Sequence, residues 1–146
     1  AEVESSDRWP KGAVVTVRRI NPPELAPPIG FTHAVVAEGT TLVLLAGQTA
    51  SNIDGVIVGE TIVEQFEQVL TNLLVALKAA GGTPSQLAKL TIYSVDPVDY
   101  RGHAKEIGQI WQRLIGRDYP AMTLIGVTRL YDDAALLEIE GIAILP

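Results

Sequence analysis

The sequence predicts an α+β fold in which a mixed β-sheet carries two long helices on one face. Two segments repeat apolar residues at helical spacing, and six other segments have the apolar, β-branched character of strands. Their order is strand, hairpin, helix, strand, helix, hairpin, which favours one layer of helices against one sheet. The length of 146 residues and the hydrophobic content of 47% suit a single domain, predicted to span residues 13–146.

The first third of the chain is predicted to contain three strands. Residues 1–12 are mostly polar and lack a periodic pattern, so they are expected to form a flexible N-terminal segment. The β-branched run Ala13–Ile20 is predicted as a strand, and the four prolines of Asn21–Gly30 exclude a ladder or a helix interior. Phe31–Ala37 and Thr41–Gly47 are expected to pair as a hairpin across a short Gly-containing connection.

The helix that begins at Thr61 has the most regular pattern. Its apolar residues recur at spacings of three and four: Ile62, Phe66, Val69, Leu70, Leu73, Leu74 and Leu77. Gly81 and Gly82 are expected to end it. The following Thr83–Gln86 has the cap residue and the proline of a single helical turn.

The second half of the chain is predicted to add three strands and one helix. Leu87–Val95 is expected to be a strand, and Pro97–Ile115 a helix that stops at Gly116. Ala121–Leu130 and Ala135–Leu145 are expected to form a final hairpin. Because the helices cover one face of the sheet and the other face also carries apolar residues, self-association is expected.

The composition argues against several partners and chemistries. The net charge of −6, with no basic run longer than Arg18-Arg19, disfavours nucleic acid. The most apolar long window, Thr61–Ala80, contains charged residues and is not expected to enter a membrane. The absence of cysteine excludes disulfides and thiol catalysis. The first residues show no signal-peptide pattern, so a cytoplasmic location is expected.

Most catalytic signatures are missing from the sequence. Glycine-rich nucleotide loops, the zinc-protease motif and the serine-hydrolase elbow do not occur. The two histidines, His33 and His103, lie 70 positions apart, and both are interpreted as structural residues. We therefore expect neither a metal nor a cofactor.

Two glutamates lie within the apolar C-terminal strand. The alternation of a strand places Glu138 and Glu140 on one face and their apolar neighbours on the other. One interpretation is a solvated face or ion pairs with Arg18, Arg19 or Arg129. The other is a carboxyl group that lines a cleft between subunits and performs acid/base catalysis.

Several short stretches occur in a recognisable order from Gly30 to the C-terminus. They are Phe31–Val35, Ala46–Gln48, the helix residues Gln65, Gln68, Asn72 and Leu73, then Lys89–Tyr93, Tyr119–Ala121 and Glu138–Ala143. In this order they resemble the Rid (YjgF) family of reactive-intermediate deaminases, which hydrolyse enamine and imine intermediates. The resemblance covers about four-fifths of the chain.

The resemblance implies a chorismate-mutase-like protomer that assembles as a homotrimer. The sheets would form an inner barrel, and three clefts between subunits would each bind a small metabolite. In deaminating members, the glutamate that begins the Glu-Ile-Glu stretch positions or activates the attacking water, and an arginine after Pro-Ala binds the substrate carboxylate. The resemblance places this glutamate at Glu138, and Gly47 and Gln48 also match the family.

Four polar positions of the family are apolar in this chain. Met122 stands at the arginine position, while Phe31, Ala46 and Ala104 stand at the tyrosine, serine and asparagine positions. These residues, with Ile92, are expected to line the cleft. Because a thioether cannot make charge-assisted bonds to a carboxylate, the usual amino-acid-derived enamine is expected to be a poor substrate.

Two functions remain open at this point. The first is an enamine or imine deaminase-type hydrolase with a non-standard substrate, in which Glu138 acts as general acid or base. The alternative is a non-catalytic trimeric protein that binds a small metabolite or another partner. The ribonuclease activity sometimes attached to this family is disfavoured by the acidic charge and by the absence of a basic groove with aromatic residues.

Overall fold

The computed structural model describes residues 16–146, and residues 1–15 lie outside this range. The predicted flexible segment 1–12 and the start of the first predicted strand, residues 13–15, therefore have no structural description. The described residues form six strands, three α-helices and one short 3-10 turn. In chain order these are β1 (Thr16–Ile20), β2 (Ala34–Glu38), β3 (Thr41–Gln48), α1 (Ile62–Ala79), the turn η2 (Pro84–Gln86), β4 (Leu87–Ser94), α2 (Pro97–Gly102), α3 (Ala104–Leu114), β5 (Ala121–Gly126) and β6 (Leu137–Leu145).

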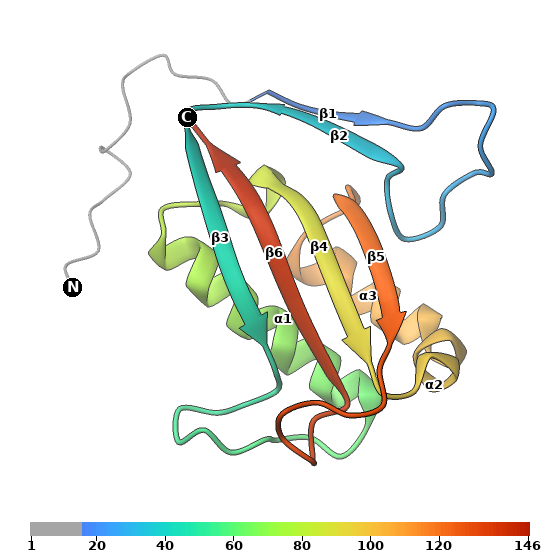
Figure 1. The fold of residues 1–146 in the computed structure, drawn as a ribbon, viewed down its shortest axis with the longest axis vertical. Helices are drawn as coiled ribbons and strands as arrows, with labels where there is room; N and C mark the ends of the chain where they lie inside the picture. Colours follow the sequence, from blue (N-terminus) through green and yellow to red (C-terminus); the bar gives the residue numbers. More distant parts are fainter. Residues whose placement is uncertain (1–15) are drawn as a thin grey trace.

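The main sheet has four strands in the order β3, β6, β4 and β5, and β1 and β2 form a separate antiparallel pair (Figure 1). β6 is antiparallel to both of its neighbours. β4 and β5 are parallel, and the chain between them passes through α2 and α3. The prediction of a mixed sheet in an α+β fold is therefore confirmed.

Both predicted hairpins are wrong. β2 pairs with β1. The connection to β3 packs against the end of β6, where the amide of Thr40 donates to the carbonyl of Leu145 at 3.0 Å. β5 pairs with β4, and β6 inserts between β3 and β4. β5 also ends at Gly126, before the predicted end of that strand at Leu130.

The helices cover one face of the main sheet (Figure 1). The second predicted helix, Pro97–Ile115, is in fact the two helices α2 and α3, which meet at His103. His103 has φ −112° and ψ 23°, it follows a glycine, and its Nδ1 donates to the carbonyl of Asp99 at 2.9 Å. The sheet thus carries one long helix, α1, and two shorter helices, α2 and α3, in place of the second long helix that was predicted. None of the helices in residues 16–146 combines the length and the apolar composition needed to cross a bilayer.

One side of α1 supplies much of the core between the helices and the sheet. Its buried apolar residues are Ile62, Phe66, Val69, Leu70, Leu73 and Leu77, in agreement with the predicted stripe. Gln65 is buried among them with 2% exposure. Its Nε2 donates to the carbonyls of Gly59 at 3.0 Å and Ala134 at 2.9 Å, and its Oε1 accepts from the amide of Leu136 at 2.8 Å. This amide therefore fixes the segment that leads into β6.

The face of the sheet without helices is here named the open face. Along β6 the side chains alternate between buried and partly buried, so Leu137 and Ile139 face the helices while Glu138 and Glu140 lie on the open face. Exposed apolar side chains also lie there, with Leu44 on β3 exposed to 71%. The open face of a single chain is thus partly apolar and has no helix layer.

Candidate functional site

Glu138 lies on the open face against the backbone of β3. A Cβ atom added to Gly47 would lie 2.1 Å from Oε1 of Glu138, so a glycine at this position leaves room for the carboxylate. Ala46 and Gly47 form a bulge, because both lie between the pairs Leu45–Gly141 and Gln48–Ile139. Ala46 is exposed at this bulge. Two predicted cleft positions are therefore adjacent to the predicted catalytic glutamate.

Glu140, the second glutamate of β6, has a different partner. Its Oε1 accepts a hydrogen bond of 2.5 Å from the hydroxyl of Tyr93 on β4. This bond, with smaller contributions from burial and from the charges of both glutamates, raises the pKa of Tyr93 above its usual value. Neither glutamate forms an ion pair with a described basic residue, and Arg19 instead pairs with Asp118 at 3.8 Å. The ion-pair interpretation of the two glutamates is therefore wrong for the described residues.

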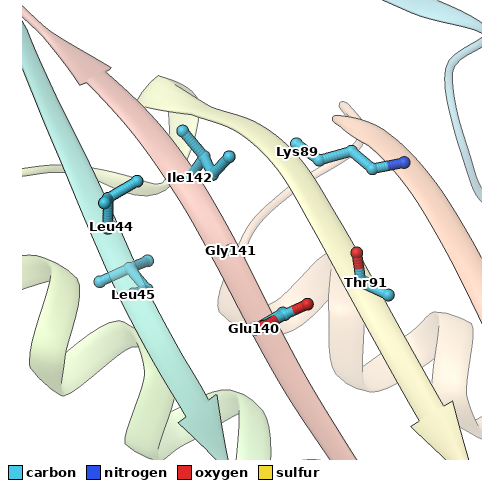
Figure 2. A pocket seen from close by; sticks show the side chains of 7 residues that line it. All are labelled: Leu44, Leu45, Lys89, Thr91, Glu140, Gly141 and Ile142. Carbon is cyan, nitrogen blue, oxygen red and sulfur yellow. The ribbon is translucent and has the colours of Figure 1, made fainter.

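A hollow of about 240 Å³ lies on the open face beside Glu140 (Figure 2). Figure 2 shows Thr91 and Lys89 on β4, with the ammonium group of Lys89 directed toward β5 and away from Glu140. Lys89 donates to the Oγ1 of Thr123 at 2.8 Å. These polar residues were not among the predicted site residues. Their position could have been predicted from the alternation of Leu87–Ser94, which places Lys89, Thr91 and Tyr93 on one face.

Met122 lies on the helix-covered face of the sheet. With Phe31 and Ile92 it lines a hollow of about 220 Å³. Phe31 is held beside the start of β5 because the next residue, Thr32, is buried and its hydroxyl donates to the carbonyl of Tyr119 at 2.8 Å. Three of the predicted cleft residues therefore meet at one hollow.

Glu138 and Met122 are separated by the sheet within one chain. Glu138 is in register with Tyr93, and Tyr93 is in register with Ile125 of β5. Met122 precedes Ile125 by three positions and so belongs to the opposite face. The predicted cleft residues form two groups, one with Glu138, Ala46 and Gly47 on the open face, and one with Phe31, Ile92, Ala104 and Met122 on the helix-covered face.

Gln48 belongs to neither group. It borders a shallow hollow of about 540 Å³ along the outer side of α1, together with Gln68 and Asn72. Asn72 donates to the carbonyls of Thr49 and Ser51 at 3.0 and 2.8 Å, which ties the loop after β3 to the helix. Asn72, one of the residues that carry the family resemblance, therefore has a structural role.

Comparisons with known proteins show the family of this chain. Residues 6–145 match the profile of the family described as Endoribonuclease L-PSP, which is the Rid/YjgF/RutC family. The chain belongs to the Rid family. A RutC family protein from Synechocystis sp. is 33% identical over 90% of this chain and 99% of its own length.

Two further Rid relatives illustrate the range of the family. The crystal structure of YyfB from Yersinia pestis, described as a Rid protein of unknown function, superposes with a TM-score of 0.79 at 37% identity. It covers 88% of this chain and 98% of YyfB. A protein of Dermatophagoides farinae named 2-iminobutanoate/2-iminopropanoate deaminase is 29% identical over 88% of this chain and 97% of its own length. The predicted family and fold are confirmed.

Another hollow, of about 200 Å³, lies on the helix-covered side of this Rid protein. It shares Met122 and Tyr100 with the 220 Å³ hollow, and Ala104 and Tyr119 also line it. Burial raises the pKa of both hydroxyl groups, and the nearby Tyr119 raises that of Tyr100 further. Both phenols therefore stay protonated at neutral pH and can donate hydrogen bonds.

The described residues offer no metal centre to this Rid protein. No three His, Asp or Glu side chains within residues 16–146 come close enough together to hold an ion. The ring of His33 contacts the carbonyl of Ala26 at 2.8 Å, in agreement with its interpretation as a structural residue. The pKa of His103 is raised mainly by its hydrogen bond to the carbonyl of Asp99. Each histidine thus contacts a nearby backbone carbonyl, His33 that of a loop residue and His103 that of a residue in α2.

Proposed function

We propose that this Rid protein is a deaminase-type hydrolase that acts on the C=N bond of a small imine or enamine with an apolar substituent. The observation that carries the proposal is the combination of an apolar hollow at Met122 with a carboxylate, Glu138, for which Gly47 leaves space. The deaminase name of the Dermatophagoides farinae relative supports the reaction class.

The proposed reaction is hydrolysis in two steps. Glu138 accepts a proton from water while the water oxygen forms a bond to the carbon of the protonated imine and the π electrons move to nitrogen, which gives a neutral amino alcohol. The amino group of this adduct then takes the proton held by Glu138. The hydroxyl group loses its proton to Glu138 as the C=O bond forms, and the C–N bond breaks to release ammonia, which takes that proton and leaves as ammonium. Glu138 returns to its carboxylate form, and no oxidant or reductant is needed.

The proposed substrate carries no carboxylate near the reacting carbon. A carboxylate in the Met122 hollow would lose its water shell without gaining a charged partner, because the lining is formed by Phe31, Ile92, Met122 and other uncharged residues. An apolar substituent would instead gain from burial in the same space. This reasoning predicts a substrate preference different from that of the deaminases that use an arginine.

The proposal requires more than one copy of the chain per site, and we propose the homotrimer that the family resemblance implies. Because Glu138 and Met122 lie on opposite faces of one sheet, a site that uses both needs Glu138 from one subunit and Met122 from the next. Leu42 and Leu44, exposed to 58% and 71% on the open face, support burial of that face against another copy.

The test compares two imines made in situ while ammonia release is followed. A flavin amine oxidase acting on benzylamine supplies an imine without a carboxylate, and 2-aminoacrylate supplies one with it. We expect the first to be hydrolysed faster, and Glu138→Gln to lower its rate by about 100-fold. Glu140→Gln, two positions along the same face, is the matched control and should keep most of the activity. Equal rates for Glu138→Gln and the unmodified protein would refute the catalytic role.

A second variant tests substrate recognition. Met122→Arg supplies the charged partner that a carboxylate needs, so hydrolysis of 2-aminoacrylate should rise by about tenfold or more. If instead ligands protect the protein against heat and ammonia release from neither imine exceeds the spontaneous rate, the protein is the alternative, a non-catalytic binder.

A further inference from the structure

The hollow between α3 and β5 is open at one side and is lined mainly by apolar side chains. Figure 1 shows α3 on the covered side of the sheet, and the hollow of about 200 Å³ lies between this helix and Met122. Phe66, Ile107 and Trp111 form its walls. Its space exists because Gly108 on α3 has no side chain, and a Cβ atom added there would meet no atom within 4 Å.

Among the described residues that line this hollow, only Tyr100 and Tyr119 carry a hydroxyl group. The ring of Tyr119 stacks on Trp111 with centroids 5.0 Å apart, and the ring of Tyr100 packs edge-on against Phe66 at 6.0 Å. Neither hydroxyl is hydrogen-bonded to another residue within 16–146. Because neither hydroxyl is held by a described protein group, both can donate to a ligand.

We propose that this hollow binds a small aromatic molecule with one hydrogen-bond acceptor oxygen, which the hydroxyls of Tyr100 and Tyr119 would hold. A cavity of roughly 150 Å³ lined by apolar side chains can bind benzene, so the present volume fits one ring with a short substituent. Ile29, exposed to 91%, and Gly30 line its rim and leave a route of entry. The hollow shares Met122 and Ala104 with the proposed substrate cleft, but binding there goes beyond the proposed hydrolysis because it needs neither Glu138 nor a second subunit.

The test is a titration of the full chain with two matched ligands, followed by NMR at the Gly108 amide and the Trp111 indole. Acetophenone has a ring and a carbonyl acceptor, whereas ethylbenzene has the ring and a short chain without the acceptor. We expect acetophenone to bind at least fivefold more tightly, which is about the effect of one net hydrogen bond. Tyr119→Phe and Tyr100→Phe should weaken acetophenone about fivefold and change ethylbenzene less than about twofold.

A filling variant tests the space itself. Gly108→Leu should abolish the binding of both ligands and raise the melting temperature, because leucine is a better helix former and fills an open volume. Gly102→Ala is the matched control, since its Cβ also meets no atom within 4 Å but lies outside the hollow, and it should leave both titrations unchanged.

Three results would overturn the proposal. They are the absence of binding for both ligands, equal affinity for the two, and unchanged titrations with Gly108→Leu. The proposed hydrolysis can fail separately, because Glu138→Gln should keep full acetophenone binding. Binding without ammonia release therefore supports the hollow and rejects the reaction, and the reverse result rejects the hollow alone.

Discussion

Gln65 gives a stability prediction that follows from its hydrogen bonds. The substitution Gln65→Leu keeps the approximate shape of the side chain and removes all three of its bonds. The carbonyls of Gly59 and Ala134 each lose a donor, and the amide of Leu136 loses its acceptor. Because the residue is only 2% exposed, bulk water cannot easily replace these partners.

The expected size of the effect follows from the number of bonds. Each net hydrogen bond contributes about 1 kcal/mol, so three of them contribute about 3 kcal/mol. The larger apolar surface of leucine returns about 1 kcal/mol by burial. The substitution should therefore lower the free energy of unfolding by about 2 kcal/mol, which corresponds to roughly 6–8 °C in melting temperature for a domain of this size.

Urea unfolding and thermal melting at pH 7 measure this change. Gln68→Leu is the matched control, because the same substitution on the same helix removes one bond between side chains, to Asn72, at a partly buried position. It should cost less than about 1 kcal/mol. If the two variants are equally stable, the three bonds of Gln65 do not hold the start of β6, and the reasoning is wrong.

Three further predictions concern the site and its surroundings. Gly47→Ala should lower imine hydrolysis at least about tenfold, because the new Cβ displaces the Glu138 carboxylate, while urea unfolding shows a change below about 1 kcal/mol since that side chain can rotate. Thr32→Val should lower stability by about 1–2 kcal/mol in the same unfolding assay, because the carbonyl of Tyr119 loses a buried donor. The pKa of Tyr100 is raised above 10.0, so the folded state holds the phenol proton more tightly than the unfolded chain. Its contribution is complete below pH 10 and is lost as the pH rises further, so Tyr100→Phe should flatten the fall in stability measured between pH 9 and 11.

The sequence predicted the elements of this fold better than their pairing. The apolar stripe of α1 is local, and a helix needs no information beyond its own residues and caps. Strand partners depend on contacts between residues far apart in the chain. An apolar run such as Ala121–Gly126 therefore does not indicate which strand it pairs with. One signal was available, because a strand, a helical segment and another strand in that order favour parallel pairing, as β4 and β5 show.

The site residues were predicted from a family resemblance, and their spatial grouping was not. Strand alternation alone correctly placed Glu138 and Glu140 on one face. The opposite placement of Met122 depends on the register of β4 with two strands, which the residue pattern does not encode. Tyr100 was not predicted as a site residue because a tyrosine within the apolar pattern of a helix is typical of core packing.

The central position of β6 has a consequence for how the chain folds. No direct ladder joins β3 to β4, so the main sheet is two separate pieces until β6 enters between them. Its pairing with β3 joins Thr41 to Leu145, one of the most distant contacts along the chain. Local elements such as α1 can form early, whereas closing the sheet needs long-range contacts that form slowly. During synthesis the facing edges of β3 and β4 therefore stay unpaired until the last strand is available, and this interval is when the chain is most open to aggregation.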